Sequence, residues 1–336
     1  GRVSKSTAWG ILARVYMFRA GEFHRMKVAE NKAETKKYFT EAGKFAKMVM
    51  TQGHDLAPNY WDYSIDQCAD RYNSTANESI WEAEFAGNGK GTMTTEGRVG
   101  NTIGIVAPDL SENNSYVGKK DPGYGYGQFW STPKLYELYT ENKDINRMNW
   151  SIAPFKYTQS LGKGGAVDGR EFEVGKLEEV KKQYWDQSFQ YGETEPGATI
   201  GDREKKTASK YYDRCCAKWR REYEADKKNR NLTAINFPIL RYSDVLLMIA
   251  ECENEINAAP TDLAYDCINE VRERAGIKVI DKGSMNTEDF RQAVKDERAM
   301  ELCFEMTRRF DLIRWGEYVQ NMNALVQRAQ SGENWN

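Results

Sequence analysis

Apolar residues recur at every third or fourth position near the start of the chain, which is the pattern of an amphipathic helix. The spacing predicts one helix over Ser4–Ala20 and a second over Glu34–Thr51, with Gly21 and Gly53 beyond them as stop signals. The periodic positions are Ala8, Ile11, Leu12, Val15 and Phe18 in the first stretch, and Tyr38, Ala42, Phe45 and Val49 in the second. We therefore expect residues 4–53 to form a helical hairpin with antiparallel helices.

The same spacing returns in the last third of the chain. It predicts helices over Ser243–Asn257, Thr261–Ala275 and Thr287–Phe304, with Thr287 as a candidate N-cap, and a last helix over Trp315–Ala329. Residues 236–329 are therefore expected to form a set of repeat helices. The hairpins have roughly the size of tetratricopeptide units, although the consensus of that repeat is missing from both.

Residues 56–234, between these helical parts, are rich in Gly, Asn, Tyr and Trp and show helical periodicity only around Thr132–Tyr139. A short strand-like piece covers Ser79–Phe85, which is too little for a large sheet. Loops of this length inside a compact domain are uncommon and usually functional. We expect one mostly α domain over residues 1–336, built of tetratricopeptide-like helical hairpins with a long, loop-rich and ligand-facing middle section.

Charge and composition exclude several classes of function. Lys and Arg total 48 and Asp and Glu total 50, so the net charge of -2 provides no positive field for nucleic acid. The longest apolar run, Val245–Ala250, is far too short to span a bilayer. His24 and His54 are the sole histidines, and the six cysteines have no zinc or redox spacing. We therefore expect no histidine triad, no metal site and no cofactor.

Two stretches of the chain resemble signatures of a known family. Residues 236–251 read NFPILRYSDVLLMIAE, and residues 297–316 read ERAMELCFEMTRRFDLIRWG. Both are similar to motifs of the SusD/RagB-type outer-membrane nutrient-binding lipoproteins of Bacteroidetes. The opening helix from Gly1 to Tyr16 and the segment from Gly123 to Arg147 also resemble that family, so the likeness spans almost the whole chain.

The resemblance implies both a fold and a function. It implies a SusD-like α-α superhelix and a non-catalytic protein that binds glycans or other nutrients at the cell surface and delivers them to a TonB-dependent (SusC-like) transporter. Such proteins meet the outer membrane through a lipid anchor. We therefore expect the lipid-bearing cysteine and the first helices to precede Gly1, and a tail to follow, so that this chain is a fragment. Met306 departs from the family, because it stands where the family has the glycine of a Glu-Gly turn.

Aromatic side chains in loops are the leading candidates for ligand contact, because sugars stack their C–H faces on aromatic rings while their hydroxyls bond to polar side chains. The candidate rings are Trp61, Tyr116, Tyr126 and Trp150, with neighbouring Asn side chains as hydroxyl partners. By contrast, the rings expected in the core are Tyr124, Phe129 and Trp130. The family's usual aromatic platform lies partly before Gly1, so weak or absent affinity is expected of this segment.

The second signature carries carboxylates one helical turn apart, at Glu297, Glu301 and Glu305. A pair of carboxylates is the machinery of most glycoside hydrolases. Alternating charges on a helix that also carries apolar residues more often form ion pairs that hold the helix to the core. We therefore expect Glu301, Glu305, Arg309 and Asp311 to be partly buried and paired, and expect no catalytic residue among them.

Two other functions stay open on the sequence alone. A helical-repeat scaffold that binds a protein or peptide is supported equally well by the hairpins, and a carboxylate-dependent glycoside hydrolase needs only two of the 50 acidic residues. A peptide scaffold presents a concave groove with short connections, whereas this chain has long loops rich in aromatics and Asn. A hydrolase requires an acid pair in a cleft, with one pKa perturbed.

Overall fold

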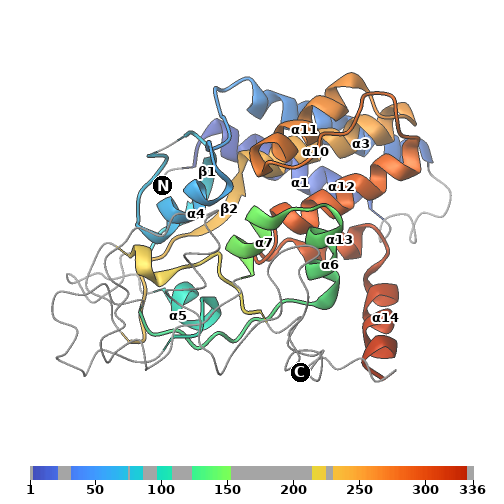
Figure 1. Ribbon diagram of the computed structural model, residues 1–336. Helices are drawn as coiled ribbons and strands as arrows, with labels where there is room; N and C mark the ends of the chain where they lie inside the picture. The colour runs from blue at the N-terminus through green and yellow to red at the C-terminus, as the bar shows by residue number, and fades with distance from the viewer. Residues whose placement is uncertain are drawn as a thin grey trace. The chain divides into compact units, whose positions relative to one another are not determined.

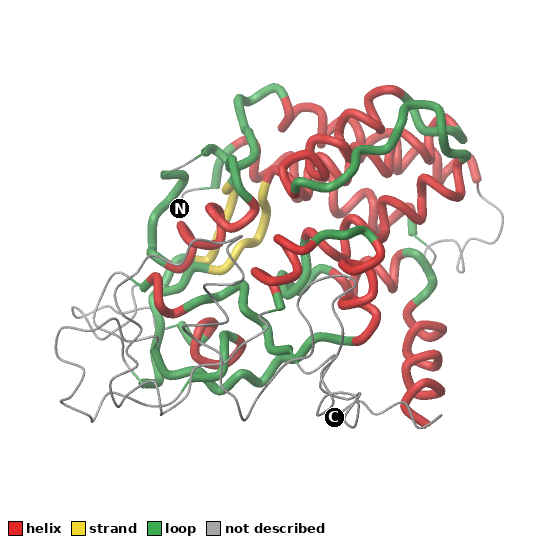
Figure 2. Tube along the Cα trace, in the orientation of Figure 1, coloured by secondary structure: helices red, strands yellow, loops and turns green. Residues whose placement is uncertain are grey.

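The computed structural model describes residues 3–21, 32–74, 76–85, 97–107, 123–152, 214–224 and 230–330. Helices dominate these residues, and the sheet is limited to two paired strands (Figure 1 and Figure 2). The mostly α fold predicted from the sequence is therefore confirmed. Among the described helices, none has the length and apolar character needed to cross a membrane.

The described chain consists of helices and one small two-stranded sheet. They are α1 (Lys5–Ala20), α3 (Lys32–Met50), α4 (Tyr60–Cys68), β1 (Ser79–Ala83), α5 (Val99–Ile103), α6 (Pro133–Glu141), α7 (Ile145–Ser151), the 3-10 turn η4 (Arg221–Tyr223), β2 (Phe237–Arg241), α10 (Tyr242–Asn257), α11 (Asp262–Ala275), α12 (Thr287–Glu301), α13 (Arg308–Arg314) and α14 (Tyr318–Gln330). The strands β1 and β2 pair with each other, which places the predicted strand-like piece beside the start of α10.

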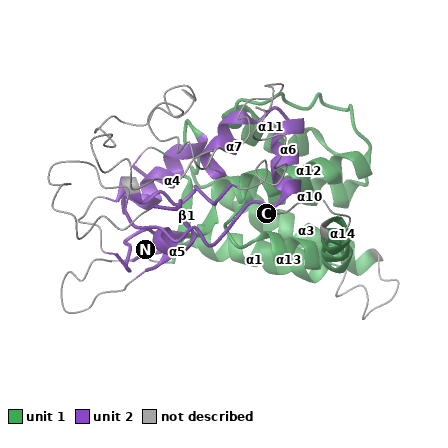
Figure 3. Cartoon of the chain, turned by 60° about the horizontal axis from the view of Figure 1, so that its bottom comes forward, with its two compact units in different colours: residues 1–59, 75–82, 238–333 green, residues 60–74, 83–237, 334–336 purple. Residues whose placement is uncertain are grey.

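The chain forms two compact units, which Figure 3 colours separately. The helical unit comprises residues 1–59, 75–82 and 238–333, and the loop-rich unit comprises residues 60–74, 83–237 and 334–336. The helical unit combines residues 1–59 with residues 238–333, so the predicted N-terminal hairpin and the predicted repeat helices share one core. The assignment of residues 1–336 to a single domain stays a prediction.

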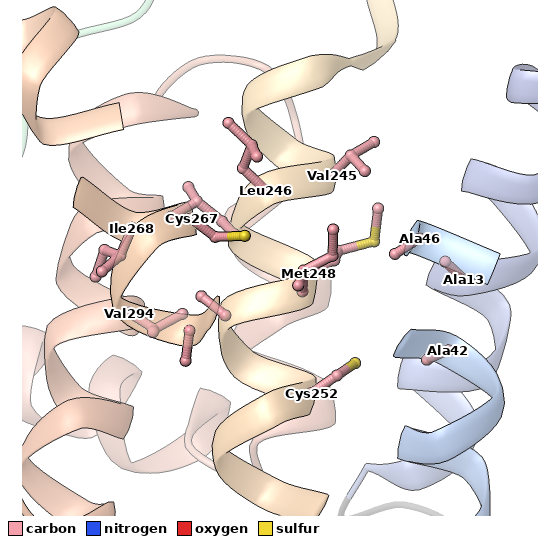
Figure 4. Close-up of a cluster of buried hydrophobic side chains, with 14 of the residues drawn as sticks. Ala13, Ala42, Ala46, Val245, Leu246, Met248, Cys252, Cys267, Ile268 and Val294 are labelled. Carbon is pink, nitrogen blue, oxygen red and sulfur yellow. The ribbon is translucent and has the colours of Figure 1, made fainter. Parts of the chain in front are cut away.

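Helix α10 is the centre of the core of the helical unit. It packs against α3, α11 and α12, while α1 packs along α3. Figure 4 shows Ala42 and Ala46 of α3 facing Met248 and Cys252 of α10. Small side chains on α3 let the two helices approach closely: a Cβ added at Gly43 would lie 3.2 Å from the Cβ of Cys252. The helix that reads most continuously apolar in the sequence is therefore the one buried on most sides.

The ends of the long helices agree with the capping signals in the sequence. Ser4 caps α1 in a reciprocal capping box with Thr7, and the hydroxyl of Thr261 accepts from a backbone N–H of α11. The cap of α12 is not the predicted Thr287 but Asn286, whose side-chain oxygen accepts from two backbone N–H groups of the first turn.

The predicted C-terminal helix over Trp315–Ala329 is present as α14, Tyr318–Gln330, which begins three residues later than predicted. The short helix α13, Arg308–Arg314, was not predicted, and the chain turns between α13 and α14 at Gly316, which has a φ of +77°. A left-handed φ favours glycine and stops an α-helix. The seven residues of α13 are too few to show a helical period, which is why the pattern alone did not predict that helix.

The loop-rich unit contains more helix than the sequence predicted. The helix expected around Thr132–Tyr139 is present as α6, capped by the hydroxyl of Thr132. The helices α4, α5 and α7 were not expected, and none of them exceeds nine residues. A helix of that length is marginal by itself and depends on its caps and packing, as in α7, where the Asp144 carboxylate caps the first turn.

Candidate functional site

Residues of both sequence signatures meet in the interior of the helical unit. Arg241, at the end of β2, donates from Nη1 to Glu301 at 2.6 Å and to Glu78 at 2.8 Å, and from Nε to Glu305 at 2.9 Å. Arg274 of α11 also donates to Glu78, at 3.0 Å, and pairs with Glu301. Burial alone would lower the pKa of Arg241, but the three carboxylates outweigh it and raise that pKa. This guanidinium therefore stays charged in the core.

A second chain of buried charges links α1, α10, α12 and α13. Asp244 accepts from Arg14 at 2.7 Å and from Arg298 at 2.8 Å. Arg298 also donates to Asp311 at 2.8 Å, and Asp311 accepts from Arg314 at 2.9 Å. Burial alone would raise the pKa of Asp244, but the two guanidinium groups outweigh it and hold that pKa below its usual range.

These clusters have the character of structural ion pairs. Glu301, Glu305 and Asp311 are buried and paired with arginines, as the sequence predicted. The pKa of Asp311 is raised by burial but more strongly lowered by Arg298 and Arg314, so it falls below its usual value. A general acid needs the opposite shift. The prediction for Arg309 is wrong: its side chain is exposed, and its guanidinium lies 5.6 Å from the ring of Tyr318.

Exposed aromatic side chains gather on the loop-rich unit. Tyr126, Phe129 and Trp130 leave between 39% and 46% of their surface accessible. The half-buried ring of Tyr124 meets that of Tyr126 edge to face, with centroids 4.8 Å apart. We call these four residues the aromatic surface. Three exposed rings and one half-buried ring within seven residues suit a ligand that presents C–H faces.

Two glycines hold one side of this segment against its neighbour. Gly125 and Ala107 exchange backbone hydrogen bonds of 3.2 and 3.0 Å. A Cβ added at Gly127 would lie 2.2 Å from Cγ2 of Val106, and the φ of Gly127 is +58°. No side chain fits at that position, so the glycine spacing is a packing requirement of the segment.

The other side of the segment is bound to residues near 215. The backbone N–H of Cys216 donates to the Phe129 carbonyl at 2.8 Å, and that of Ser131 donates to the Arg214 carbonyl at 2.7 Å. The aromatic surface therefore stands on a backbone that is hydrogen-bonded on both sides. Such a backbone presents its rings to a ligand with little further loss of conformational entropy.

The four predicted site residues have different positions. Tyr126 is exposed and belongs to the aromatic surface, whereas Trp61 lies in the first turn of α4 and is half-buried. Trp150 is 0% exposed, because α7 turns its ring inward, 3.9 Å beneath the guanidinium of Arg220. The expectation that the Trp150 ring is accessible to a ligand is wrong. Tyr116 lies outside the described residues, and the structure gathers Tyr126 with Tyr124 rather than with the other candidates.

Phe129 and Trp130 were missed by the sequence prediction, which put them in the core. Their proximity to the helix at Pro133 suggested burial, but Thr132 caps that helix and the rings before it point outward. A usable signal was present in the alternation of residues 123–128. Every second residue there is a buried glycine, and the residues between them are half-buried or exposed, which is the two-residue period of an extended segment.

Among the described residues, no group of three or more His, Cys, Asp or Glu side chains is placed to hold a metal ion. Cys252 and Cys267 are buried thiols in the core of the helical unit. Burial raises the pKa of both, that of Cys267 to about 12. These thiols are packing residues and not nucleophiles, because the reactive form of cysteine is the thiolate.

A family model described as the SusD family matches residues 77–336. Two curated relatives from Formosa agariphila match shorter stretches. SusD-like protein P25 is 44% identical over 96 residues, which are 28% of this chain and 18% of that protein. SusD-like protein P2 is 34% identical over 95 residues, which are 26% of this chain and 18% of that protein.

Solved structures extend the likeness over almost the whole chain. A SusD homolog from Bacteroides thetaiotaomicron has a TM-score of 0.72 and 24% identity, covering 97% of this chain and 56% of its own. A laminarin binding SusD-like protein has a TM-score of 0.56 and 18% identity, covering 96% of this chain and 57% of its own. At these identities the likeness shows the fold. The chain spans little more than half the length of these two proteins.

Proposed function

Because this chain belongs to the SusD family, we propose that it binds a glycan without reacting with it, and that the aromatic surface makes the contact. The observation that carries the proposal is the exposure of Tyr126, Phe129 and Trp130 on a backbone that is hydrogen-bonded on both sides. Trp61 and Tyr116 are proposed as further contacts from the sequence. Trp150 is not, because its ring is buried.

The chemistry of the aromatic surface supports a sugar ligand. Aromatic rings offer flat apolar faces, while the exposed side chain of Gln128 and the guanidinium of Arg230, 5.2 Å from the ring of Tyr124, offer hydrogen bonds to hydroxyl groups. Related folds point the same way. One relative is named for laminarin binding, and another was solved with a xylogluco-oligosaccharide.

The absence of catalysis is part of the proposal and has a physical support. The carboxylates of the second signature accept hydrogen bonds from arginines, and the pKa of Asp311 is lowered, whereas a glycosidase acid needs a raised pKa. Incubating the pure chain with laminarin and xyloglucan and assaying reducing ends tests this point. We expect no release of oligosaccharide above the buffer control, and release that requires Glu301 would refute it.

For the whole protein we propose a surface-exposed, lipid-anchored place in the outer membrane and delivery of the bound glycan to a TonB-dependent, SusC-like transporter. This step is based on membership of the family and not on a contact in the structure. The chain spans little more than half the length of a SusD homolog of solved structure. Purifying the tagged full-length protein from outer membranes tests it. We expect a TonB-dependent transporter to co-purify, and a tagged protein found in the soluble fraction without one contradicts this step.

The binding proposal is tested by calorimetry of the chain against oligosaccharides of laminarin and xyloglucan. For the glycan that binds best, we compare Tyr126→Ala and Trp130→Ala with the parent chain. A ring contact contributes about 0.5–1.5 kcal/mol beyond its buried area. Each variant loses that contribution and the buried area as well, so it should bind at least about 2-fold more weakly.

The control is Phe310→Ala, which removes a still more exposed ring from the helical unit. It should bind glycan like the parent. Equal affinity of the parent, Tyr126→Ala and Trp130→Ala would show that the aromatic surface is not the site.

A further inference from the structure

A separate cleft of about 820 Å³ opens in the helical unit. Five helices surround it. The C-terminal ends of α1 and α13 form part of its lining, and the first turns of α3, the second half of α10 and the helix α12 form the rest. Its volume is within the usual range of small-molecule sites, about 300–1,000 Å³. All of its lining residues belong to the helical unit, so the cleft is distinct from the aromatic surface.

The carboxylates inside the cleft are already satisfied by donors of the protein. Both oxygens of Glu251 accept from Arg314, with Oε2 2.7 Å from Nη2, and Oε1 also accepts from Nε1 of Trp315 at 2.9 Å. Both oxygens of Glu255 accept from Arg291, at 2.6 and 2.8 Å. The interior therefore has little capacity left to accept a hydrogen bond or a positive charge.

The cations of the cleft, by contrast, have donors to spare. Lys36 is exposed, and its ammonium has no hydrogen-bond or ion-pair partner among the described residues. Lys295 donates to Glu317, which leaves two further N–H groups on that ammonium. Arg291 completes its contacts with Glu288, whose side chain is 79% exposed at the rim and can be displaced.

Further positive charge surrounds the indole of Trp315, which forms part of the wall. Its ring centroid lies 4.7 Å from the guanidinium of Arg314 and 5.3 Å from both Lys295 and Arg308. Cations near an indole are attracted to its face. The side of the ring that a neutral sugar would need for stacking is thus shared with cations. The lining of the cleft has four cationic side chains and three carboxylates, and this positive excess of one charge favours an anion.

We propose that this cleft binds an anionic sugar, one that bears a carboxylate or sulfate group, with Lys36, Lys295 and Arg291 as the ligands of the acidic group. The sugar part of this inference rests on the proposed function, and the preference for an anion rests on the spare donors of the cleft. The carboxylate and sulfate groups share the same chemistry, since both are acceptor-only anions with several oxygens.

The test measures binding of three probes by calorimetry: a galacturonic acid trisaccharide, a sulfated galactose disaccharide and a neutral galactose trisaccharide. We expect at least one acidic probe to bind at least tenfold more tightly than the neutral one. In a nuclear magnetic resonance spectrum, that probe should also shift the indole N–H resonance of Trp315. Lys36→Glu and Lys295→Gln should each weaken the acidic probe at least fivefold. The two acidic probes distinguish the carboxylate from the sulfate.

The matched control is Lys37→Glu, which makes the same charge change one residue further along α3 and outside the cleft. It should bind the acidic probe within twofold of the parent. If Lys36→Glu and Lys37→Glu weaken binding equally, the effect is one of net charge and the cleft is not the site. Neutral and acidic probes of equal affinity would also overturn the inference.

A second control separates this inference from the proposed function. Trp130→Ala should leave the acidic probe unaffected, since the cleft belongs to the other unit. If Trp130→Ala instead removes the binding of every probe, the cleft proposal fails and the aromatic surface stands. If the acidic probe binds in a manner that depends on Lys36 while no glycan responds to Tyr126→Ala or Trp130→Ala, the anion site stands and the proposed function fails.

Discussion

Replacing Arg241 with methionine isolates the structural role of the buried charges. Methionine retains an unbranched apolar stem but removes the guanidinium that Glu78, Glu301 and Glu305 share. Arg274 would still pair with Glu78 and Glu301, whereas Glu305 would lose its ion pair with Arg241. Removing one partner of a buried ion pair costs about 3–5 kcal/mol. We expect the free energy of unfolding to fall by that amount, a large share of the about 5–15 kcal/mol that stabilises a domain.

The measurement is urea denaturation followed by far-ultraviolet circular dichroism, repeated between pH 7 and pH 5. In Arg241→Met the remaining carboxylates repel one another, and binding of protons in the folded state relieves that repulsion. The folded state then binds more protons than the unfolded state, so stability rises as the pH falls. The deficit of the variant relative to the parent should therefore shrink towards pH 5, while glycan affinity of the folded protein stays unchanged.

The control is Arg309→Met, the same substitution at an exposed arginine of the same signature. It should change the free energy of unfolding by less than about 0.5 kcal/mol. A loss of less than about 1 kcal/mol in Arg241→Met, or a deficit that grows on acidification, would refute the assignment of a structural ion pair. Reduced glycan affinity at full stability would point to a ligand contact instead.

Three further predictions concern stability. Met306 has a φ of +59° and is 51% exposed, so Met306→Gly should raise the free energy of unfolding by about 0.5–1 kcal/mol in urea, whereas Met306→Ala should be neutral. The pKa of Asp244 is depressed in the folded state, so its stabilisation is present above the unfolded pKa of about 3.9 and should be lost as the pH falls towards the folded value, seen as a falling Tm between pH 5 and pH 2. Gly127→Ala should destabilise the loop-rich unit by about 1–3 kcal/mol in thermal melts because of Val106, and more than Gly53→Ala, where a Cβ meets nothing within 4 Å.

The long helices were predictable because each buries one continuous face. Helices of 14 to 19 residues, such as α3 and α11, show several turns of apolar spacing and have glycine beyond their ends. The short helices α4, α5 and α7 of the loop-rich unit were not predictable in this way. Two turns contain too few positions for a period, and tertiary packing decides their conformation.

The exposure of single aromatic rings was the least predictable part of the candidate site. Trp150 and Trp130 lie in similar sequence surroundings, yet one is fully buried and the other is 40% exposed. The difference arises from residues distant in the chain: Arg220 covers the ring of Trp150, while the bridge between Trp130 and Cys215 joins backbone to backbone. No local pattern contains that information.

The departure at Met306 shows how far a signature can change while the cluster beneath it stays intact. Glu305, the residue before it, is buried against Arg241, whereas the side chain of Met306 lies in solvent. Met306 has the left-handed conformation that glycine adopts most readily, so the side chain at this position adds strain to the turn. The φ angle limits which residues suit position 306, whereas the buried ion pair requires a carboxylate at Glu305 and a cation at Arg241. The sequence predicts that such charges pair, but the partner, 64 residues away, is determined only by the fold.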